Sequence, residues 1–441
     1  MWTPELRPGQ VKYAAIVAEI KRAIESGLLR ANEPLPPQRE LAFRLGVNLT
    51  TVTRAYAEAT RIGLVAGEVG RGTFVRAESV EARIFIETAK QHDEIDLLTV
   101  GGFTEGMTDG MSGFLATSPS PASLFGYGSD LTLWRATEAA IQWCRWRGYE
   151  PASRPILCNG AQAGLDAVLR ILSGQTQAIL CEEYTFPGLK NAARLNELRL
   201  IPVACDAEGA MPDALAKQAR MSGARIFVTV PNGQNPTGAV MSEARRLAIA
   251  ETAARLGIAV VEDDVYGALC GQPPLVNHLQ GEHVYITSLS KCVAPGLKFG
   301  FVAGRHPALE RLAQEVTLTT WLTSPLLHGI AADLISSGTA QGLARRHSEN
   351  LSRRMAVGER VFGTTTNPCS PFLWLAVPGD ATEFAKEAAL RGVLVACSGS
   401  FSAGRRRGRF VRASAHGDVS ETKLLRGLTI LQQMGARRED G

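Results

Sequence analysis

Lys291 is the residue whose chemistry is easiest to interpret in this sequence. It follows Ser288-Leu289-Ser290, directly after the apolar run at residues 284–287, which is typical of a buried strand. A lysine amine held at the end of such a strand can add to a carbonyl carbon and form a Schiff base. The Ser-x-Ser-Lys string alone is a weak signal, so its interpretation depends on the groups that other segments bring to Lys291.

Three upstream segments carry the groups that a lysine-bound pyridoxal phosphate (PLP) would need. Asp263 and Tyr266 follow the apolar run at residues 259–261, and Asn235 lies in an Asn-Pro-Thr-Gly string after the run at residues 225–230. PLP requires an acid that keeps the pyridine nitrogen protonated, and neutral donors for the phenolic oxygen O3′. We therefore expect Asp263 to pair with the ring nitrogen, and Asn235 and Tyr266 to hydrogen-bond O3′.

The remaining requirements are a phosphate site and an aromatic cover for the ring. The string Asn-Gly-Ala-Gln at residues 159–162 opens a predicted helix, whose first backbone amides suit a phosphate group. Phe186 can stack on the pyridine ring. The predicted phosphate ligands are Gly160, Ala161, Gln162, Ser288, Ser290 and Lys298.

Each of these residues also has a purely structural interpretation. An Asp after a strand often caps a helix, Asn-Pro-Thr-Gly is often only a turn, and Phe186 could belong to the core. The order and spacing of the full set favour a PLP site over several unrelated explanations.

Helical stretches alternate with short β-branched runs from about residue 96 onward. The clearest runs are residues 178–180, 225–230, 259–261 and 284–287. Such alternation predicts an α/β domain with a mostly parallel sheet that is covered by helices on both faces. Ligands of open α/β sheets collect at the carboxyl ends of the strands, where the candidate residues stand.

These motifs resemble those of the fold-type I aminotransferases, class I/II, over residues 96–430. The resemblance implies a PLP fold-type I domain with a small C-terminal α+β part. It also implies that Tyr127 reaches the phosphate of a neighbouring subunit and that Arg412 binds a substrate carboxylate. Lys298 stands where the family usually has arginine, so the positive charge is kept but the bidentate fork is lost.

Residues 1–76 follow a different pattern. Apolar residues recur at helical spacing over residues 11–29, a short helix is expected at residues 37–45, and Asn48 can cap a third helix at residues 49–62. Two short apolar runs then flank a glycine-rich turn, which predicts a two-stranded wing. Short helices joined by a tight turn and followed by a wing describe a winged helix-turn-helix.

The strings at residues 35–42, 51–56 and 70–75 resemble those of GntR-type regulators, which implies binding to double-stranded operator DNA. The alternative is a helical dimerisation cap without DNA affinity, and each arginine could be an ordinary solvated charge. Leu49 stands where the family often has a basic residue, and it either contacts a thymine methyl group or packs inward. The expected DNA-contacting residues are Arg39, Thr50, Thr51, Thr53, Arg54 and Arg71.

Charge and cysteine usage agree with a regulator of this kind. Residues 1–76 hold 11 Lys and Arg against 7 Asp and Glu, so the whole formal excess of +4 lies in this segment. The eight cysteines are scattered without zinc-binding spacing, so we expect no metal. No apolar run approaches the length of a membrane span and the N-terminus lacks a signal pattern, so we expect a cytoplasmic protein with no membrane partner.

The sequence thus predicts a winged helix-turn-helix over residues 1–76, a linker over residues 77–95 and an aminotransferase-like PLP-binding domain over residues 96–441. This order resembles the MocR-type subfamily of GntR regulators, which implies a PLP-dependent transcription factor and a head-to-tail homodimer. In this interpretation a small amino compound displaces Lys291 to form an external aldimine, and the domains repack. Two alternatives stay open: an active aminotransferase with an accessory DNA-binding domain, and a regulator that senses PLP itself.

Overall fold

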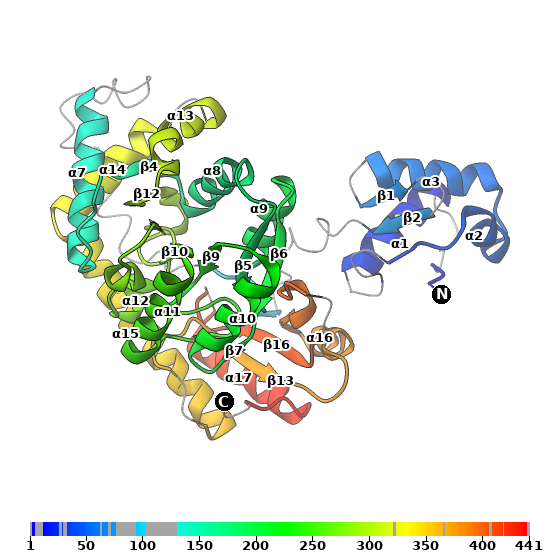
Figure 1. Ribbon diagram of the computed structural model, residues 1–441. Coiled ribbons are helices and arrows are strands. Elements are labelled where there is room, and N and C mark those ends of the chain that lie inside the picture. Colours follow the sequence, from blue (N-terminus) through cyan, green and yellow to red (C-terminus); the bar gives the residue numbers. More distant parts are fainter. Residues whose placement is uncertain are drawn as a thin grey trace.

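The computed structural model describes an N-terminal module and a larger main domain, drawn in blue and in cyan to red in Figure 1. The described residues are 2–4, 12–25, 29, 33–61, 64–68, 72–75, 94–101, 130–320, 323–364, 367–404, 408–417 and 419–438. Arg71, Tyr127 and nearly all of the predicted linker lie outside them. Within these ranges, no helix combines the length and the apolar character needed to cross a membrane.

The N-terminal module consists of three helices followed by a hairpin, as predicted. Its elements are α1 (Lys12–Glu25), α2 (Gln38–Leu45), α3 (Leu49–Arg61), β1 (Val65–Glu68) and β2 (Gly72–Val75), with β1 and β2 antiparallel. Gly46 ends α2 in the left-handed conformation, with φ of 60°, which glycine adopts without steric cost. Asn48 starts α3 because its side-chain oxygen accepts a hydrogen bond from the Thr50 amide at 3.2 Å.

The core of this module is built from the inward faces of α1 and α3. Ile16 and Ile20 of α1 and Val52 and Ala55 of α3 are fully buried in one cluster. Their spacing of three or four residues places them on one face of each helix. The opposite face of α3 is therefore left to solvent.

A seven-stranded sheet forms the centre of the main domain, in the order β4-β12-β11-β10-β9-β5-β6. Only β12 runs antiparallel to its neighbours, so the predicted mostly parallel sheet is confirmed. The four predicted runs correspond to β5, β9, β10 and β11, whereas the sequence patterns did not indicate β4, β6 and β12. The strands are β4 (Ile156–Asn159), β5 (Ala178–Glu182), β6 (Arg199–Val203), β9 (Ile226–Thr229), β10 (Ala259–Asp263), β11 (His283–Ser288) and β12 (Phe299–Arg305).

Helices cover both faces of this sheet, as predicted. Side chains alternate along β11, where Val284 and Ile286 join one buried cluster and Tyr285 joins the other. The cluster of Val284 includes side chains of α8 (Ala161–Ser173), α9 (Pro187–Leu195) and α13 (Ala308–Thr320). The cluster of Tyr285 includes side chains of α7 (Asp130–Trp146), α10 (Pro212–Ser222), α11 (Glu243–Leu256) and α14 (Pro325–Ser336).

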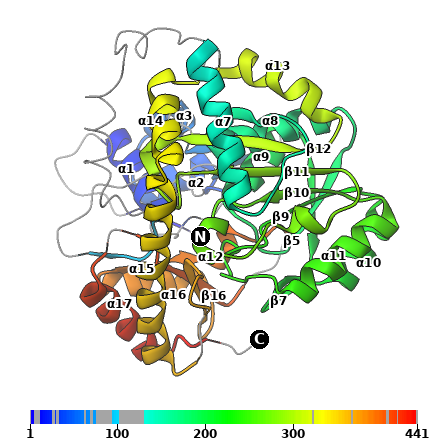
Figure 2. The ribbon, with the colours of Figure 1, turned by 90° about the vertical axis from the view of Figure 1, so that its left-hand side faces the viewer.

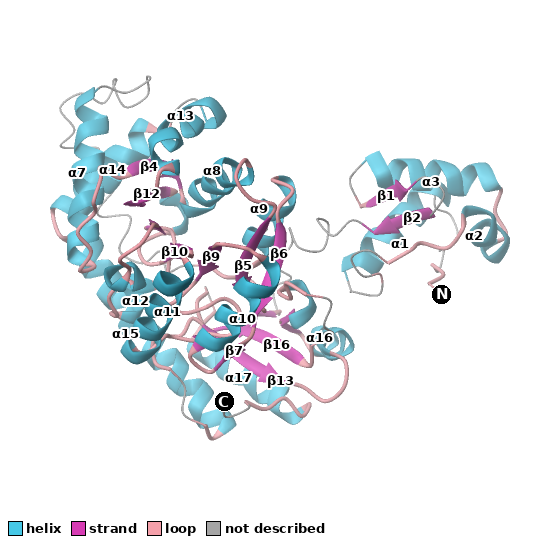
Figure 3. Cartoon of the chain, viewed as in Figure 1, coloured by secondary structure: helices cyan, strands magenta, loops and turns pink. Residues whose placement is uncertain are grey.

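The long helix α15 (Thr339–Phe362) leads into a smaller C-terminal part, which Figure 2 shows around α16 and α17. Its strands β13 and β16 form a second sheet with β15, drawn in magenta in Figure 3. β3, at the start of the main domain, pairs parallel with β14 and so joins this part. The elements are β3 (Ile95–Asp96), β13 (Phe372–Ala376), α16 (Ala381–Leu390), β14 (Val393–Leu394), β15 (Ala396–Cys397), β16 (Phe410–Ser414) and α17 (Glu421–Gln433).

The shorter elements are connections around the main sheet. They are β7 (Cys205–Asp206), β8 (Gly209–Ala210), α12 (Gly267–Cys270) and the 3-10 turns Leu275–His278, Pro295–Leu297 and Ser398–Ser400. The α12 and Pro295–Leu297 segments follow β10 and β11, so they lie at the carboxyl edge of the sheet, where the candidate site residues stand.

Candidate cofactor and DNA sites

The described cofactor candidates meet around one cavity of about 500 Å³ at the carboxyl ends of β4, β9, β10 and β11. Because these strands run in the same direction, segments far apart in the sequence end at the same edge of the sheet. Tyr127 lies outside the described residues. The predicted residues that line the cavity are Gly160, Ala161, Gln162, Phe186, Asn235, Asp263, Tyr266, Ser288, Ser290, Lys291 and Lys298.

Lys291 extends from the turn after β11 toward the small C-terminal part. Its Nζ donates a hydrogen bond to the backbone oxygen of Val100 at 2.9 Å. Burial, followed by the positive charges of Arg412 and Lys298, lowers the pKa of Lys291 to about 8, although Asp263 opposes the shift. A substantial fraction of the amine is therefore neutral near physiological pH, as a nucleophilic lysine requires.

Asp263 and Asp264 are adjacent, but their side chains have opposite surroundings. Asp263 lines the cavity, and burial raises the pKa of its carboxyl group to about 7. Asp264 is instead held in the core, where its carboxylate accepts hydrogen bonds from Asn232 at 2.7 Å and Tyr285 at 2.8 Å. Arg147 completes a buried ion pair with Asp264 at 3.3 Å. Only Asp263 is thus placed to meet a ligand in the cavity.

Arg412 is fully buried in β16 and points toward the same cavity edge. Its guanidinium donates to Oδ1 of Asn235 at 2.8 Å and to the backbone oxygen of Leu98 at 2.6 Å. The rings of Phe372 and Phe401 lie 4.8 Å and 4.9 Å from its central carbon. Burial lowers the pKa of Arg412 to about 10, so the group remains cationic at neutral pH. Arg412 is therefore a positively charged group fixed in position beside Asn235, which is the predicted hydrogen-bond partner of O3′.

The phosphate cradle is the N-terminus of α8. Gly160 precedes this helix with φ of 82° and no side chain caps the first turn, which leaves its first amides to an external acceptor. Gly300 of β12 packs so closely that an added Cβ would lie 2.7 Å from the Ala161 nitrogen. Lys298 approaches Gly160 from the same strand edge. Backbone amides and one cation at a helix N-terminus fit a phosphate group.

Phe186 sits at the start of α9 and lines the cavity, as a ring that covers the cofactor would. Gly188 permits this position, because an added Cβ there would lie 2.9 Å from the Phe186 ring. Gln162 donates to the Gly188 oxygen at 3.1 Å and so joins α8 to the Phe186 turn. The donor set, the acid and the aromatic cover together fit PLP.

Sequence reasoning missed several groups of this site. Val100 and Asn191 line the cavity, and His347 contacts the backbone oxygen of Cys292 at 3.0 Å, next to Lys291. Burial lowers the pKa of His416, whose ring meets the Tyr266 ring at a centroid distance of 6.0 Å. Backbone carbonyls and isolated histidines carry no motif, so no pattern in one sequence could have identified them.

The predicted DNA face lies on α2 and the start of α3. Arg39, Thr50, Thr53 and Arg54 are exposed, and Thr51 is half-buried, whereas Arg71 lies outside the described residues. Leu49 is 38% exposed, so it does not pack inward. Thr50, Thr53 and Arg54 therefore share one face of α3, the expected recognition helix, and Arg39 is exposed on α2.

Two of these side chains also make contacts within the module. The Arg54 guanidinium lies over the Tyr13 ring at 4.0 Å, and Thr53 donates to the Gln38 side chain at 2.8 Å. These contacts link α3 to α1 and to α2. Arg54 and Thr53 are thus partly oriented before any DNA is bound.

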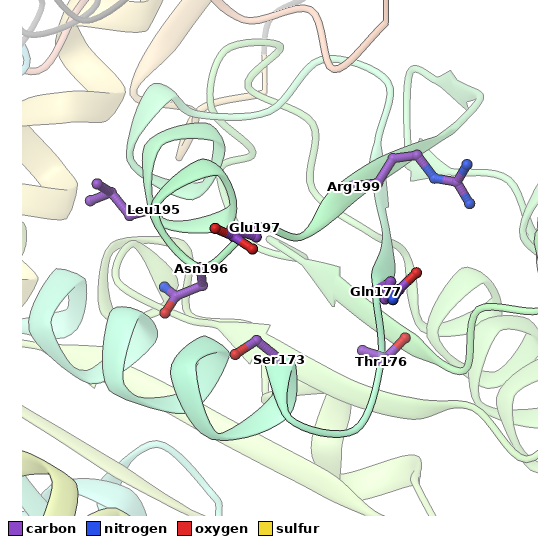
Figure 4. A pocket seen from close by; sticks show the side chains of 7 residues that line it. All are labelled: Ser173, Thr176, Gln177, Leu195, Asn196, Glu197 and Arg199. Carbon is purple, nitrogen blue, oxygen red and sulfur yellow. The ribbon is translucent and has the colours of Figure 1, made fainter.

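A second hollow, of about 670 Å³, opens at the amino ends of β5 and β6 (Figure 4). It is lined by Ser173, Thr176, Gln177, Leu195, Asn196, Glu197 and Arg199. None of the predicted site residues that the structure describes lines it, and its carboxylate and guanidinium come from the surface residues Glu197 and Arg199. The chemically specific residues gather in the cavity around Lys291 instead.

Comparison with known proteins gives two family matches along the chain. Residues 132–427 match the class I and II aminotransferases, and residues 12–75 match the gntR family of bacterial regulatory proteins. The first match covers more than half of the chain and includes Lys291 and Arg412. The second covers the three helices and the hairpin of the N-terminal module.

Two similar proteins are named as transcriptional regulators. The HTH-type regulator YdeF of Bacillus subtilis is 28% identical over 98% of this chain and 96% of its own length. The vitamin B6 salvage pathway transcriptional repressor PtsJ of Salmonella typhimurium is 28% identical over 71% of this chain and 73% of its own length.

Solved aminotransferases share the fold of the main domain. A kynurenine aminotransferase of Pyrococcus horikoshii covers 80% of this chain and 97% of its own, with a TM-score of 0.71 at 21% identity. An archaeal alanine:glyoxylate aminotransferase covers 86% of this chain and 98% of its own, with a TM-score of 0.73 at 18% identity.

Proposed function

We propose that this chain senses a small amino compound through PLP held at Lys291. The chain belongs to the class I and II aminotransferase family, and it is a MocR-type transcriptional regulator with a gntR-family DNA-binding module. The observation that carries the proposal is the single cavity that Lys291, Asp263, Asn235 and the N-terminus of α8 line together. A structural lysine and a structural aspartate would have no reason to converge there with an uncapped helix.

Each residue of the cavity binds a different part of PLP. When bound, PLP supplies an electrophilic carbon for amines and a ring that withdraws electrons from them. Lys291 provides the amine that attaches to this carbon, and Asp263 keeps the ring nitrogen protonated. The amides of α8, with Ser288, Ser290 and Lys298, hold the phosphate. Asn235 and Tyr266 donate to O3′ and Phe186 covers the ring.

The ligand class follows from Lys291 and Arg412. With PLP bound, Lys291 would be the amine that holds the cofactor, and the amino group of a ligand would displace it and leave its Nζ as a free amine. Arg412 lies beside Asn235, so a carboxylate on the ligand meets a buried guanidinium there. We infer that the effector is an amino acid or a related amino-carboxylate.

The DNA side of the proposal rests on the exposed face of α3. Thr50, Thr51, Thr53 and Arg54 are placed to reach base edges from the first turns of the recognition helix, and Arg39 to contact phosphate. We further propose a head-to-tail homodimer in which Tyr127 of one subunit completes the phosphate site of the other, with Arg71 on the wing at the DNA.

The test combines absorbance with operator binding on the full-length protein. Reduction with borohydride and mass spectrometry should place PLP on Lys291, and amino acids that change the cofactor absorbance should change affinity for DNA upstream of the gene. Repeated amino transfer to a keto acid without any effect on DNA binding would instead make the protein an aminotransferase with an accessory module.

A second candidate function is the sensing of PLP itself. The similarity to PtsJ, a repressor named for vitamin B6 salvage, favours this alternative. The comparison that separates the two is operator affinity of the apo protein and of the PLP-loaded protein without any amine. A change at this step alone, with no further change on adding amino acids, supports PLP as the effector.

A further inference from the structure

The segment at residues 94–101 enters the main domain from the DNA-binding side of the sequence and is fixed first to the small C-terminal part. The Ile95 amide donates to the Gly392 oxygen at 2.8 Å, and the Leu97 amide donates to the Leu394 oxygen at 3.0 Å. The Leu97 oxygen accepts from the Ser414 amide at 2.8 Å. Residues 95–97 are therefore held by backbone bonds on both sides.

The next residues leave this sheet and meet the ligand site. The Leu98 oxygen accepts a hydrogen bond from Arg412 at 2.6 Å, and the Val100 oxygen accepts one from Nζ of Lys291 at 2.9 Å. These two donors are the groups that a ligand carboxylate and the cofactor require. One three-residue stretch of backbone thus occupies both of them, and it also lines the cavity at Val100.

Asp96 sets the shape of this stretch. Its Oδ1 accepts hydrogen bonds from the Leu98 amide at 3.0 Å and from the Thr99 amide at 2.9 Å. These bonds fold the backbone directly after β3, which aims the Leu98 and Val100 oxygens at their donors. The Asp96 side chain is not one of the cavity residues, but its negative charge also acts on Arg412, where it partly offsets the lowering of the pKa by burial.

We propose that residues 97–101 form a strap that competes with PLP for Lys291 and with the carboxylate of the ligand for Arg412, and that Asp96 is the positioning residue that holds the strap. This inference rests on the proposed function and names how occupation of the site is transmitted. In the PLP-loaded protein Lys291 is already engaged by the cofactor, so the carboxylate of a bound ligand takes Arg412, the remaining donor of the strap, and the strap loosens. Residues 76–93 connect the strap to the DNA-binding module in the sequence. A movement of the strap therefore changes the orientation in which that module meets DNA.

The first test follows the strap in the PLP-loaded full-length protein. Methoxyamine has a carbonyl-reactive amine but no carboxylate, whereas aminooxyacetate has both, so only aminooxyacetate takes Arg412 as well as the cofactor carbon. Amide hydrogen exchange of residues 97–101 should become faster with aminooxyacetate and change less with methoxyamine. Unchanged or slower exchange of this segment in the presence of aminooxyacetate would overturn the strap.

The second test separates the turn from the charge of Asp96. Asp96→Asn keeps an oxygen that can accept from Leu98 and Thr99, and Asp96→Ala removes it. Asp96→Ala should lose most of the change in operator affinity that aminooxyacetate causes in the unaltered protein, whereas Asp96→Asn should retain it. Both variants should keep the absorbance of lysine-bound PLP, which shows that the fold and the cofactor site persist.

Each outcome has a distinct meaning. An Asp96→Ala protein that responds to aminooxyacetate like the unaltered one, or an Asp96→Asn protein that loses the response equally, contradicts the positioning role. An unaltered protein whose operator affinity ignores aminooxyacetate contradicts the proposed function, while hydrogen exchange still decides whether the strap moves. If Asp96→Ala does not fold, the exchange measurement on the unaltered protein remains the deciding experiment.

Discussion

The cofactor cavity and the DNA face of α3 are held in different ways. The cavity is assembled from strand ends that are distant in sequence, and Asp263 within it and Arg412 beside it are buried. The DNA face comes from one helix and its neighbour, and its candidates are mostly exposed. A buried charge that loses its partner costs several kcal/mol of folding free energy, whereas an exposed charge is screened by water and salt. Single substitutions should therefore have large effects in the cavity and small, additive effects on the DNA face.

The largest expected effect is the loss of the covalent cofactor link in Lys291→Ala. This protein should fold and lose the absorbance of lysine-bound PLP, with no borohydride-stable adduct by mass spectrometry. Lys217→Ala, on the exposed face of α10, is the matched control and should keep the adduct. An adduct that persists on another lysine in Lys291→Ala would remove Lys291 from the centre of the site.

Substitution of Asp264 should reduce the stability of the protein, whereas substitution of the adjacent Asp263 should reduce its function. Asp264→Asn leaves Arg147 without its buried counter-charge, so the apo protein should lose about 3–5 kcal/mol of unfolding free energy. Asp263→Asn should not destabilise the apo protein at pH 8, because burial raises the folded pKa of Asp263 and its charged form already opposes folding there.

Urea unfolding of both apo variants measures this difference, and PLP absorbance measures the function. Asp263→Asn should keep PLP bound but reduce any amino transfer by about two orders of magnitude or more, because a preorganised charge is lost. A larger functional loss in a fully folded Asp264→Asn protein would show that the wrong carboxylate was assigned to the ring nitrogen.

The capture of PLP by the apo protein should depend on pH through Lys291. The neutral amine is the nucleophile, and its pKa is lowered to about 8, so the capture rate should rise with pH up to about 8 and then level off. Below that pH the neutral fraction falls about tenfold per unit. Stopped-flow absorbance after mixing with PLP measures the rate. A rate that continues to climb toward the ordinary lysine pKa would contradict the effect of burial.

The smallest effect is expected at the DNA face. Arg39→Ala should weaken binding of all DNA sequences to a similar degree, and it should lower the slope of log affinity against log salt by about one unit. Glu58→Gln, on the same module, supplies a variant of altered charge that is not expected to contact DNA. A loss that is confined to one operator sequence would assign Arg39 to a base edge instead of a phosphate.

Local patterns predicted the fold and the set of cofactor residues, because strand ends and helix starts carry recognisable strings. The helix capped by Asn48 and the strands β10 and β11 were both readable from spacing alone. The Arg147–Asp264 pair joins positions 117 residues apart, and no local signal connects them. The contacts of Lys291 and Arg412 with Val100 and Leu98 involve backbone oxygens, which every residue has. Long-range and backbone contacts therefore required the structure.

The most direct test of the central claim is operator affinity of the PLP-loaded full-length protein with and without aminooxyacetate. If the site at Lys291 controls the DNA-binding module, affinity should change by about 5–150-fold, the range of typical allosteric coupling. Lys291→Ala should show no such change. An operator affinity that stays constant in the unaltered protein, while the cofactor absorbance reports full reaction with aminooxyacetate, would contradict the account.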